Sequence, residues 1–158
     1  MSTDPGREPL LAADITMDDA WAIYDFLVPR LESLQRAHGD GTEERRTAEA
    51  LAEAISVLVL EIEREIRGPM RPHLAKSSAR PPAPAPAPTE SERIAREKQR
   101  LTMIREYWNQ LHAIVQVWRD SEGYDRVRWR QVGFLDAAAE AEYRRYVTEA
   151  GLRKAERP

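Results

Sequence analysis

Five of the eight residues at positions 81–88 are proline, and this stretch constrains the fold more than any other feature of the sequence. Proline has no amide hydrogen to donate and its ring holds φ near the polyproline II value, so the stretch suits neither a helix nor a central strand. At about 3.1 Å per residue it predicts a semi-rigid spacer roughly 25 Å long. Residues with helical periodicity lie on both sides, so we expect two modules joined by a linker at residues 69–88.

The composition favours a folded protein with a large charged surface and no strong charge of either sign. Of the 158 residues, 42% are hydrophobic and 32% are charged, and the formal net charge is −3. This balance predicts no general attraction to nucleic acids or to an anionic membrane. Residues 1–80 carry 10 Lys and Arg against 15 Asp and Glu, whereas residues 81–158 carry 14 against 12. The two modules are therefore expected to attract each other weakly.

The sequence lacks three features that would indicate a secreted or membrane protein. The chain contains no cysteine, which excludes disulfides, cysteine-ligated zinc and iron–sulfur clusters. The first fourteen residues lack the basic start and apolar run of a signal peptide. The longest apolar run, at residues 54–60, is interrupted by Ser56 and is far shorter than the ~20 residues that span a bilayer. We expect a cytoplasmic protein with no membrane association, and the preference for Ala and Arg over Ile and Lys suggests a bacterial or phage source.

The first module, residues 16–68, is predicted to be a helical hairpin that follows a flexible tail at residues 1–15. Thr16 is placed to cap a helix whose apolar residues recur at steps of three and four, and Pro29 inside that helix predicts a kink. A glycine-rich turn then leads to a second helix, which is expected to end at Gly68. Both helices have an apolar face and a charged face, as expected for an antiparallel pair.

The second helix is apolar nearly all round at its centre. Val57 and Leu60 lie off the stripe that contains Ile55, Leu58 and Ile62. A hairpin covers only one side of each helix, so this apolar girdle predicts a further neighbour. Three neighbours satisfy the pattern: the second module folding back, a second copy of the chain, or another protein.

The second module, residues 89–151, is predicted to contain two helices and to be followed by a charged tail at residues 152–158. A Thr-x-x-Glu capping box at Thr89 begins the first of these helices. Its apolar seam covers fewer than three heptads, which is typical of a helix packed against an antiparallel neighbour. Asp136 is expected to cap the last helix and Gly151 to end it.

An alternation of arginine and aromatic residues is the strongest candidate for a nucleic-acid contact. Arg126, Arg128 and Arg130 are flanked by Tyr124 and Trp129 in a connector that has the pattern of extended chain. Arginine binds phosphates and aromatic faces stack on bases. The charge of this half of the chain is only weakly positive, so the alternative is that these arginines pair with the acidic first module or with a partner protein.

No motif in the sequence predicts catalysis, a metal site or a cofactor. The three histidines have no His or Glu partner at metal-binding spacing, and phosphate-binding loops and nucleophile elbows are missing. The aromatic residues of the small second module fit two alternatives, a place in the core or an anchor at a protein interface. The residues we predict for a protein interface are Ile55, Val57, Leu58, Leu60, Ile62, Trp108 and Trp118.

The sequence therefore favours an all-α, non-enzymatic interaction or adaptor protein without cofactors. It is expected to assemble with itself, as a homo-oligomer, or with a partner protein through apolar helix faces. The alternative hypothesis is a nucleic-acid-binding accessory factor that uses the arginine and aromatic residues at positions 124–130.

Overall fold

The computed structural model describes residues 8–68, 83–134 and 136–155, and the regular structure in these ranges is entirely helical. In these ranges four α-helices and two short 3-10 helices follow one another, in the order η1 (Ala12–Asp14), α1 (Met17–Ala37), α2 (Glu43–Arg67), α3 (Glu90–Val115), η2 (Gln116–Trp118) and α4 (Ala137–Ala155). The prediction of an all-α protein is confirmed. Most of the predicted linker lies outside the described residues.

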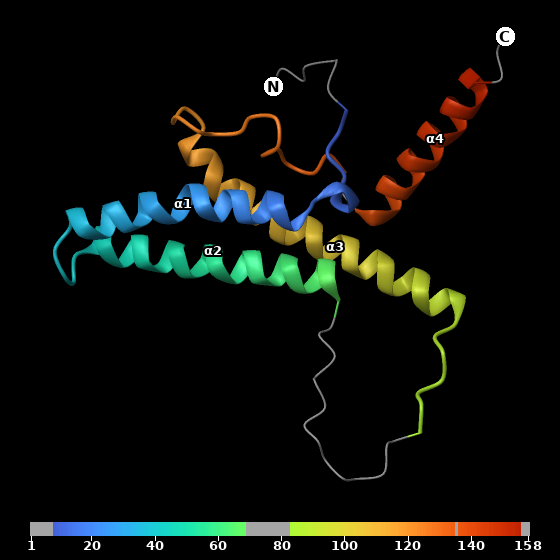
Figure 1. Ribbon diagram of the computed structural model, residues 1–158, viewed down its shortest axis with the longest axis horizontal. Coiled ribbons are helices and arrows are strands. Elements are labelled where there is room, and N and C mark those ends of the chain that lie inside the picture. The colour runs from blue at the N-terminus through green and yellow to red at the C-terminus, as the bar shows by residue number, and fades with distance from the viewer. Residues whose placement is uncertain (1–7, 69–82, 135, 156–158) are drawn as a thin grey trace.

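α1 and α2 lie side by side and run in opposite directions (Figure 1). α1 begins at a capping box in which the Thr16 side chain accepts from the Asp19 amide and the Asp19 carboxylate accepts from the Thr16 amide. Pro29 lies inside α1 without ending it. The turn between the helices passes through Gly41 at a φ of 78°, a left-handed conformation that favours glycine.

α3 runs back along α2 in the opposite direction and packs against a second side of α2 (Figure 1). Its capping box joins Thr89 and Glu92, as the sequence indicates. A single cluster of buried residues includes Ile55 and Ile62 of α2 together with Ile104 of α3. α3 therefore covers the part of the apolar girdle that contains Ile55 and Ile62, whereas Val57 and Leu60 stay exposed.

The first third of α3 extends beyond the end of α2, and α4 points away from the other helices (Figure 1). The side chains at positions 91–99 of α3 are all exposed. The expected end of the last helix at Gly151 is wrong, because α4 continues to Ala155. Gly151 is not among the glycines with positive φ, and a glycine inside a helix costs only about 1 kcal/mol relative to alanine.

The segment before α1 differs from the flexible tail that the lack of a periodic pattern suggests. Leu11, Ala12 and Ile15 are buried in the core. The backbone of this segment is also bonded to a distant part of the chain, since the Gly133 amide donates to the Leu10 carbonyl at 3.1 Å. Residues 8–15 therefore form part of the packed structure, and residues 1–7 lie outside the described ranges.

The connector between η2 and α4 is built from turns instead of the extended chain that its alternating pattern suggests. The carboxylate of Asp125 accepts from the amides of Val127 and Arg128 at 3.0 and 2.9 Å. The Trp129 amide donates to the Asp125 carbonyl at 3.0 Å. Aspartate side chains that bond the backbone two and three residues later stabilise tight turns, so Asp125 outweighs the strand-like alternation.

Candidate protein-interaction surface

The residues predicted for a protein interface divide into a buried and an exposed group. Four of them are in the core: Ile55, Leu58, Ile62 and Trp108. The indole of Trp108 donates to the Arg130 carbonyl at 2.7 Å, so its polar atom is satisfied within the chain. Trp118 is half-buried. Only Val57 and Leu60 keep more than half of their surface exposed, at 52% and 56%.

Val57 and Leu60 lie on a face of α2 that the other described elements leave open. This face, which we call the outer seam of α2, consists of exposed residues at alternating steps of three and four: Ala50, Glu53, Val57, Leu60, Arg64 and Arg67. The two apolar side chains are at its centre and charged residues lie on both sides. An apolar centre inside a charged border is the usual composition of a protein-binding surface.

The arginines of the outer seam are paired with carboxylates of their own helix. Arg64 forms ion pairs with Glu61 and Glu65, and Arg67 lies 2.9 Å from Glu63. Both arginine side chains are more than 60% exposed. Ion pairs of this kind contribute about 0–1 kcal/mol, so these guanidinium groups can exchange partners at little cost.

A second apolar surface lies between the projecting part of α3 and the start of α4. It is a groove of about 390 Å³ whose apolar lining consists of Ile94, Leu101, Ala137, Ala138 and Ala141. Ile94 is 60% exposed. Arg93, Glu97 and Lys98 complete the lining. No local pattern in the sequence indicates this groove, because its two walls are more than thirty residues apart and one of them is made of alanines.

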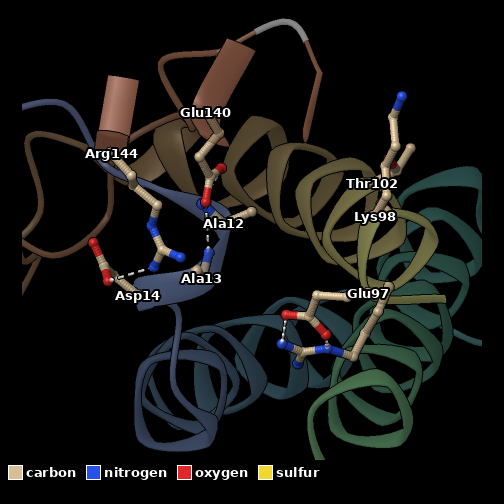
Figure 2. Close-up of polar contacts among 9 residues, drawn as sticks. Ala12, Ala13, Asp14, Glu97, Lys98, Thr102, Glu140 and Arg144 are labelled. Carbon is tan, nitrogen blue, oxygen red and sulfur yellow. Dashed lines mark hydrogen bonds and ion pairs between the residues drawn. The ribbon is translucent and has the colours of Figure 1, made fainter. Parts of the chain in front are cut away.

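The start of α4 is attached to η1 by a buried carboxylate. Glu140 is only 1% exposed, and its two oxygens accept from the amides of Ala12 at 2.8 Å and Ala13 at 3.1 Å (Figure 2). Arg144, one turn further along α4, lies 3.8 Å from the carboxylate of Asp14 (Figure 2). The carboxylate is thus compensated by backbone donors, and its role is to hold two distant segments together.

The arginines predicted for nucleic-acid contact make bonds within the chain. Arg128 pairs with Asp19 of α1 at 2.6 Å. Arg130 donates to the carbonyls of Val127 and Glu8, at 2.8 and 2.9 Å. The third arginine, Arg126, lies 2.9 Å from Asp120. The structure thus shows intramolecular pairing of this cluster.

The aromatic residues of the same cluster contribute to packing. Trp129 is buried, and its ring lies edge-to-face with Phe26 at 4.9 Å and with Tyr124 at 5.1 Å. The guanidinium of Arg30 lies over the Phe26 ring at 3.7 Å from its centroid. A buried ring has no face available for stacking on a base, so Trp129 acts as part of the core.

The described part of the chain shows no grouping of three or more His, Cys, Asp or Glu residues that could hold a metal ion. None of the helices described there combines the length and apolar character needed to cross a membrane. No protein-family model matches the chain, and none of the curated proteins or solved structures compared with it is similar to it.

Proposed function

We propose that this chain is a non-enzymatic interaction protein that assembles with itself or with a partner protein through apolar helix faces. The observation that carries the proposal is the exposed pair Val57 and Leu60 at the centre of α2. Single exposed apolar residues are common on proteins. These two are neighbours one turn apart, and they lie on a long helix that is already fixed on two sides.

The rigidity of α2 supports a role in binding. Binding costs free energy whenever a flexible segment becomes ordered, and a helix held by packing on two sides has little of this cost to meet. Ile55, Val59 and Ile62 provide that packing, and each is fully buried. The outer seam is therefore a preformed surface.

The two-module organisation is part of the same proposal. A helical hairpin at residues 16–68 and a helical pair at residues 89–151 are joined by the proline-rich linker in a cytoplasmic protein of bacterial or phage origin. The charge difference between the halves supports the return of α3 to α2.

Affinity purification of the full chain from its native cells, with mass spectrometry and a nuclease-treated sample, tests this function. Replacing the exposed pair, Val57→Ser with Leu60→Ser, is expected to abolish recovery of the bound protein without unfolding the chain, since both side chains are already half-exposed. The matched control is Val117→Ser with Val127→Ser, two exposed valines elsewhere, at 73% and 58%. The proposal fails if neither another protein nor a native copy of the chain is recovered with the tagged chain, if the two double variants behave alike, or if nuclease removes the recovered material.

A further inference from the structure

The outer seam of α2 has the spacing of one side of a two-helix interface. Its six residues follow steps of three, four, three, four and three along the helix. Such alternation keeps a row of side chains facing a neighbouring helix over several turns. The seam continues along most of α2, so a helix of similar length would match it.

We infer that the occupant of this seam is a second copy of the same chain, with the two α2 helices antiparallel. This inference rests on the proposed function, which it deepens by naming the partner. A twofold axis that passes between Val57 and Leu60 places Val57 of each copy against Leu60 of the other. Surfaces related by a twofold axis are self-complementary, as in most symmetric dimers.

The charges of the seam are arranged symmetrically about that axis. Glu53 lies four residues before Val57, and Arg64 lies four residues after Leu60. In the antiparallel arrangement Glu53 of each copy faces Arg64 of the other, which gives opposite charges on both sides of the apolar centre. At the ends Ala50 faces Arg67, so that a long aliphatic stem covers a small side chain.

A parallel arrangement of the same two helices is disfavoured by the same residues. It would place Glu53 opposite Glu53, Arg64 opposite Arg64 and Arg67 opposite Arg67. Like charges across an interface exclude the wrong orientation. An unrelated helix could cover Val57 and Leu60, but the inverted positions of Glu53 and Arg64 are what pairing between identical helices requires.

The apolar centre contributes only two side chains from each copy, so we expect association that depends strongly on concentration. Dimers with small interfaces form weakly and exchange quickly. In sedimentation equilibrium, the mass is expected to rise from 18.1 kDa toward twice that value as the protein concentration increases. A mass that stays at that of the monomer up to millimolar protein overturns the inference.

Cysteine cross-linking tests the orientation, because the natural chain contains no cysteine. We would prepare Glu53→Cys and Arg64→Cys with tags of different length and oxidise them alone and mixed. With a rise of about 1.5 Å per residue, antiparallel pairing brings position 53 opposite position 64 but keeps two copies of position 53 about 17 Å apart. A disulfide needs Cα atoms about 4.4–6.8 Å apart.

Cross-linking is therefore expected in the mixture, between the two variants, and not in either variant alone. Val117→Cys, at an exposed position outside the seam, measures the background from random collisions. Cross-linking of each variant with itself above this background indicates a parallel dimer and overturns the inference. Equal background in all samples overturns it as well.

A charge exchange provides an independent measurement on the uncross-linked protein. Arg64→Glu is expected to weaken association about three- to tenfold, because each dimer loses two opposite-charge contacts and gains two repulsions. Adding Glu53→Arg to the same chain restores the opposite charges and should return association to within about twofold of the natural protein. No rescue by the double variant contradicts the antiparallel register.

The failure of this inference can be distinguished from the failure of the proposed function. A chain that stays monomeric, yet still recovers another protein in a way that depends on Val57 and Leu60, retains the proposed function and excludes self-pairing. A monomeric chain whose recovery does not depend on these residues loses both.

Discussion

α2 and α4 are both long, charge-rich helices, but different interactions hold them in place. α2 is packed between α1 and α3 and buries five residues, Ala48, Ile55, Leu58, Val59 and Ile62. Among the described side chains of α4 only Ala137 and Glu140 are buried. Tyr146 and Val147, further along α4, are largely exposed.

From this difference we expect the two helices to differ in stability, because a regular apolar stripe holds α2 and a buried polar contact holds α4. The buried residues of α2, from Ala48 to Ile62, distribute its stabilisation over about four turns, so no single residue decides whether the helix stays packed. α4 depends on a few contacts near its first residue. We therefore expect α4 to separate from the core without unfolding α2, a local opening of the kind that hydrogen exchange detects.

The largest effect is expected from Trp108→Ala, which tests whether α2 and α3 share one core. Trp108 is 1% exposed and belongs to the same buried cluster as the α1 and α2 residues. Its removal should lower the free energy of unfolding by about 3–5 kcal/mol, in one transition seen by both circular dichroism and tryptophan fluorescence in urea. Trp21→Ala, at an exposed tryptophan, is the control and should cost less than about 1 kcal/mol.

Two separated transitions in the Trp108 variant would contradict a shared core. In that case α1 and α2 would remain folded as an independent hairpin while α3 and α4 unfolded. The difference between α2 and α4 would then be a difference between two modules that fold independently.

The second largest effect is expected from Glu140→Ala, which removes the carboxylate that joins α4 to η1. The amides of Ala12 and Ala13 would lose their acceptors, at about 1–3 kcal/mol for each buried group left unsatisfied. Hydrogen exchange measured by mass spectrometry should accelerate in residues 8–15 and 137–155. Exchange in α2 should remain unchanged.

Glu142→Ala is the matched control, since Glu142 is an exposed glutamate on the same helix. Glu140→Gln keeps one amide oxygen as an acceptor and should give an intermediate effect. Equal acceleration in α2 and α4 would show that α4 belongs to the same cooperative unit as the core, which removes the distinction between the two helices.

The parts of the fold that could be predicted are those determined by neighbours in the sequence. Thr16 and Thr89 cap their helices because a capping box is formed within four residues. The apolar steps of three and four likewise identify α1, α2 and α3 without knowledge of what they contact. Gly151 misleads, because glycine ends a helix only when it adopts positive φ, and here it does not.

The parts that could not be predicted depend on distant contacts. Glu140 bonds to residues 127 and 128 positions away, and no local pattern indicates such a bond. The same holds for the apolar girdle of α2, whose periodicity predicts a neighbour without identifying α3. In the candidate interaction surface, the sequence indicates Val57 and Leu60 as apolar residues off the main stripe, but their exposure depends on which side of α2 the distant helix α3 covers.

A smaller effect, confined to α4, is expected from Gly151→Ala. No atom lies close to the position that a Cβ would occupy there, so the methyl group meets no clash and the gain is about 1 kcal/mol of helix propensity. Helical content measured by circular dichroism should rise slightly, while the midpoint of core unfolding should not change. Gly123→Ala is the opposing control and should destabilise the protein, because φ at Gly123 is 84°, a conformation that strains alanine. The added Cβ would lie 3.8 Å from the Phe26 ring.

A higher midpoint of core unfolding in the Gly151→Ala variant would contradict the expected independence of α4 from α2. It would mean that stabilising the far end of α4 stabilises the core, so that the two are coupled through more than the first turn of the helix. An unchanged midpoint together with a destabilised Gly123→Ala variant is the result we expect.

The smallest effect is a pH dependence of the core that α4 should not share. Burial lowers the pKa of His112 from its ordinary 6.5, and a backbone hydrogen bond with Trp129 opposes this shift in part. The unfolded chain therefore binds a proton at His112 more readily than the folded chain does, so the free energy of unfolding falls as the pH is lowered through about 6.5. His112→Gln should remove this contribution. The measurement is the difference between the urea midpoints of the natural protein and the variant, followed from pH 8 to pH 5.5, where most carboxylates remain ionised. Hydrogen exchange in α4 should show no matching change in that interval, since α4 contains no histidine. A midpoint difference that does not vary with pH would show that the imidazole titrates as freely in the folded chain as in the unfolded one, and that the core end of α3 is more open to water than its burial indicates.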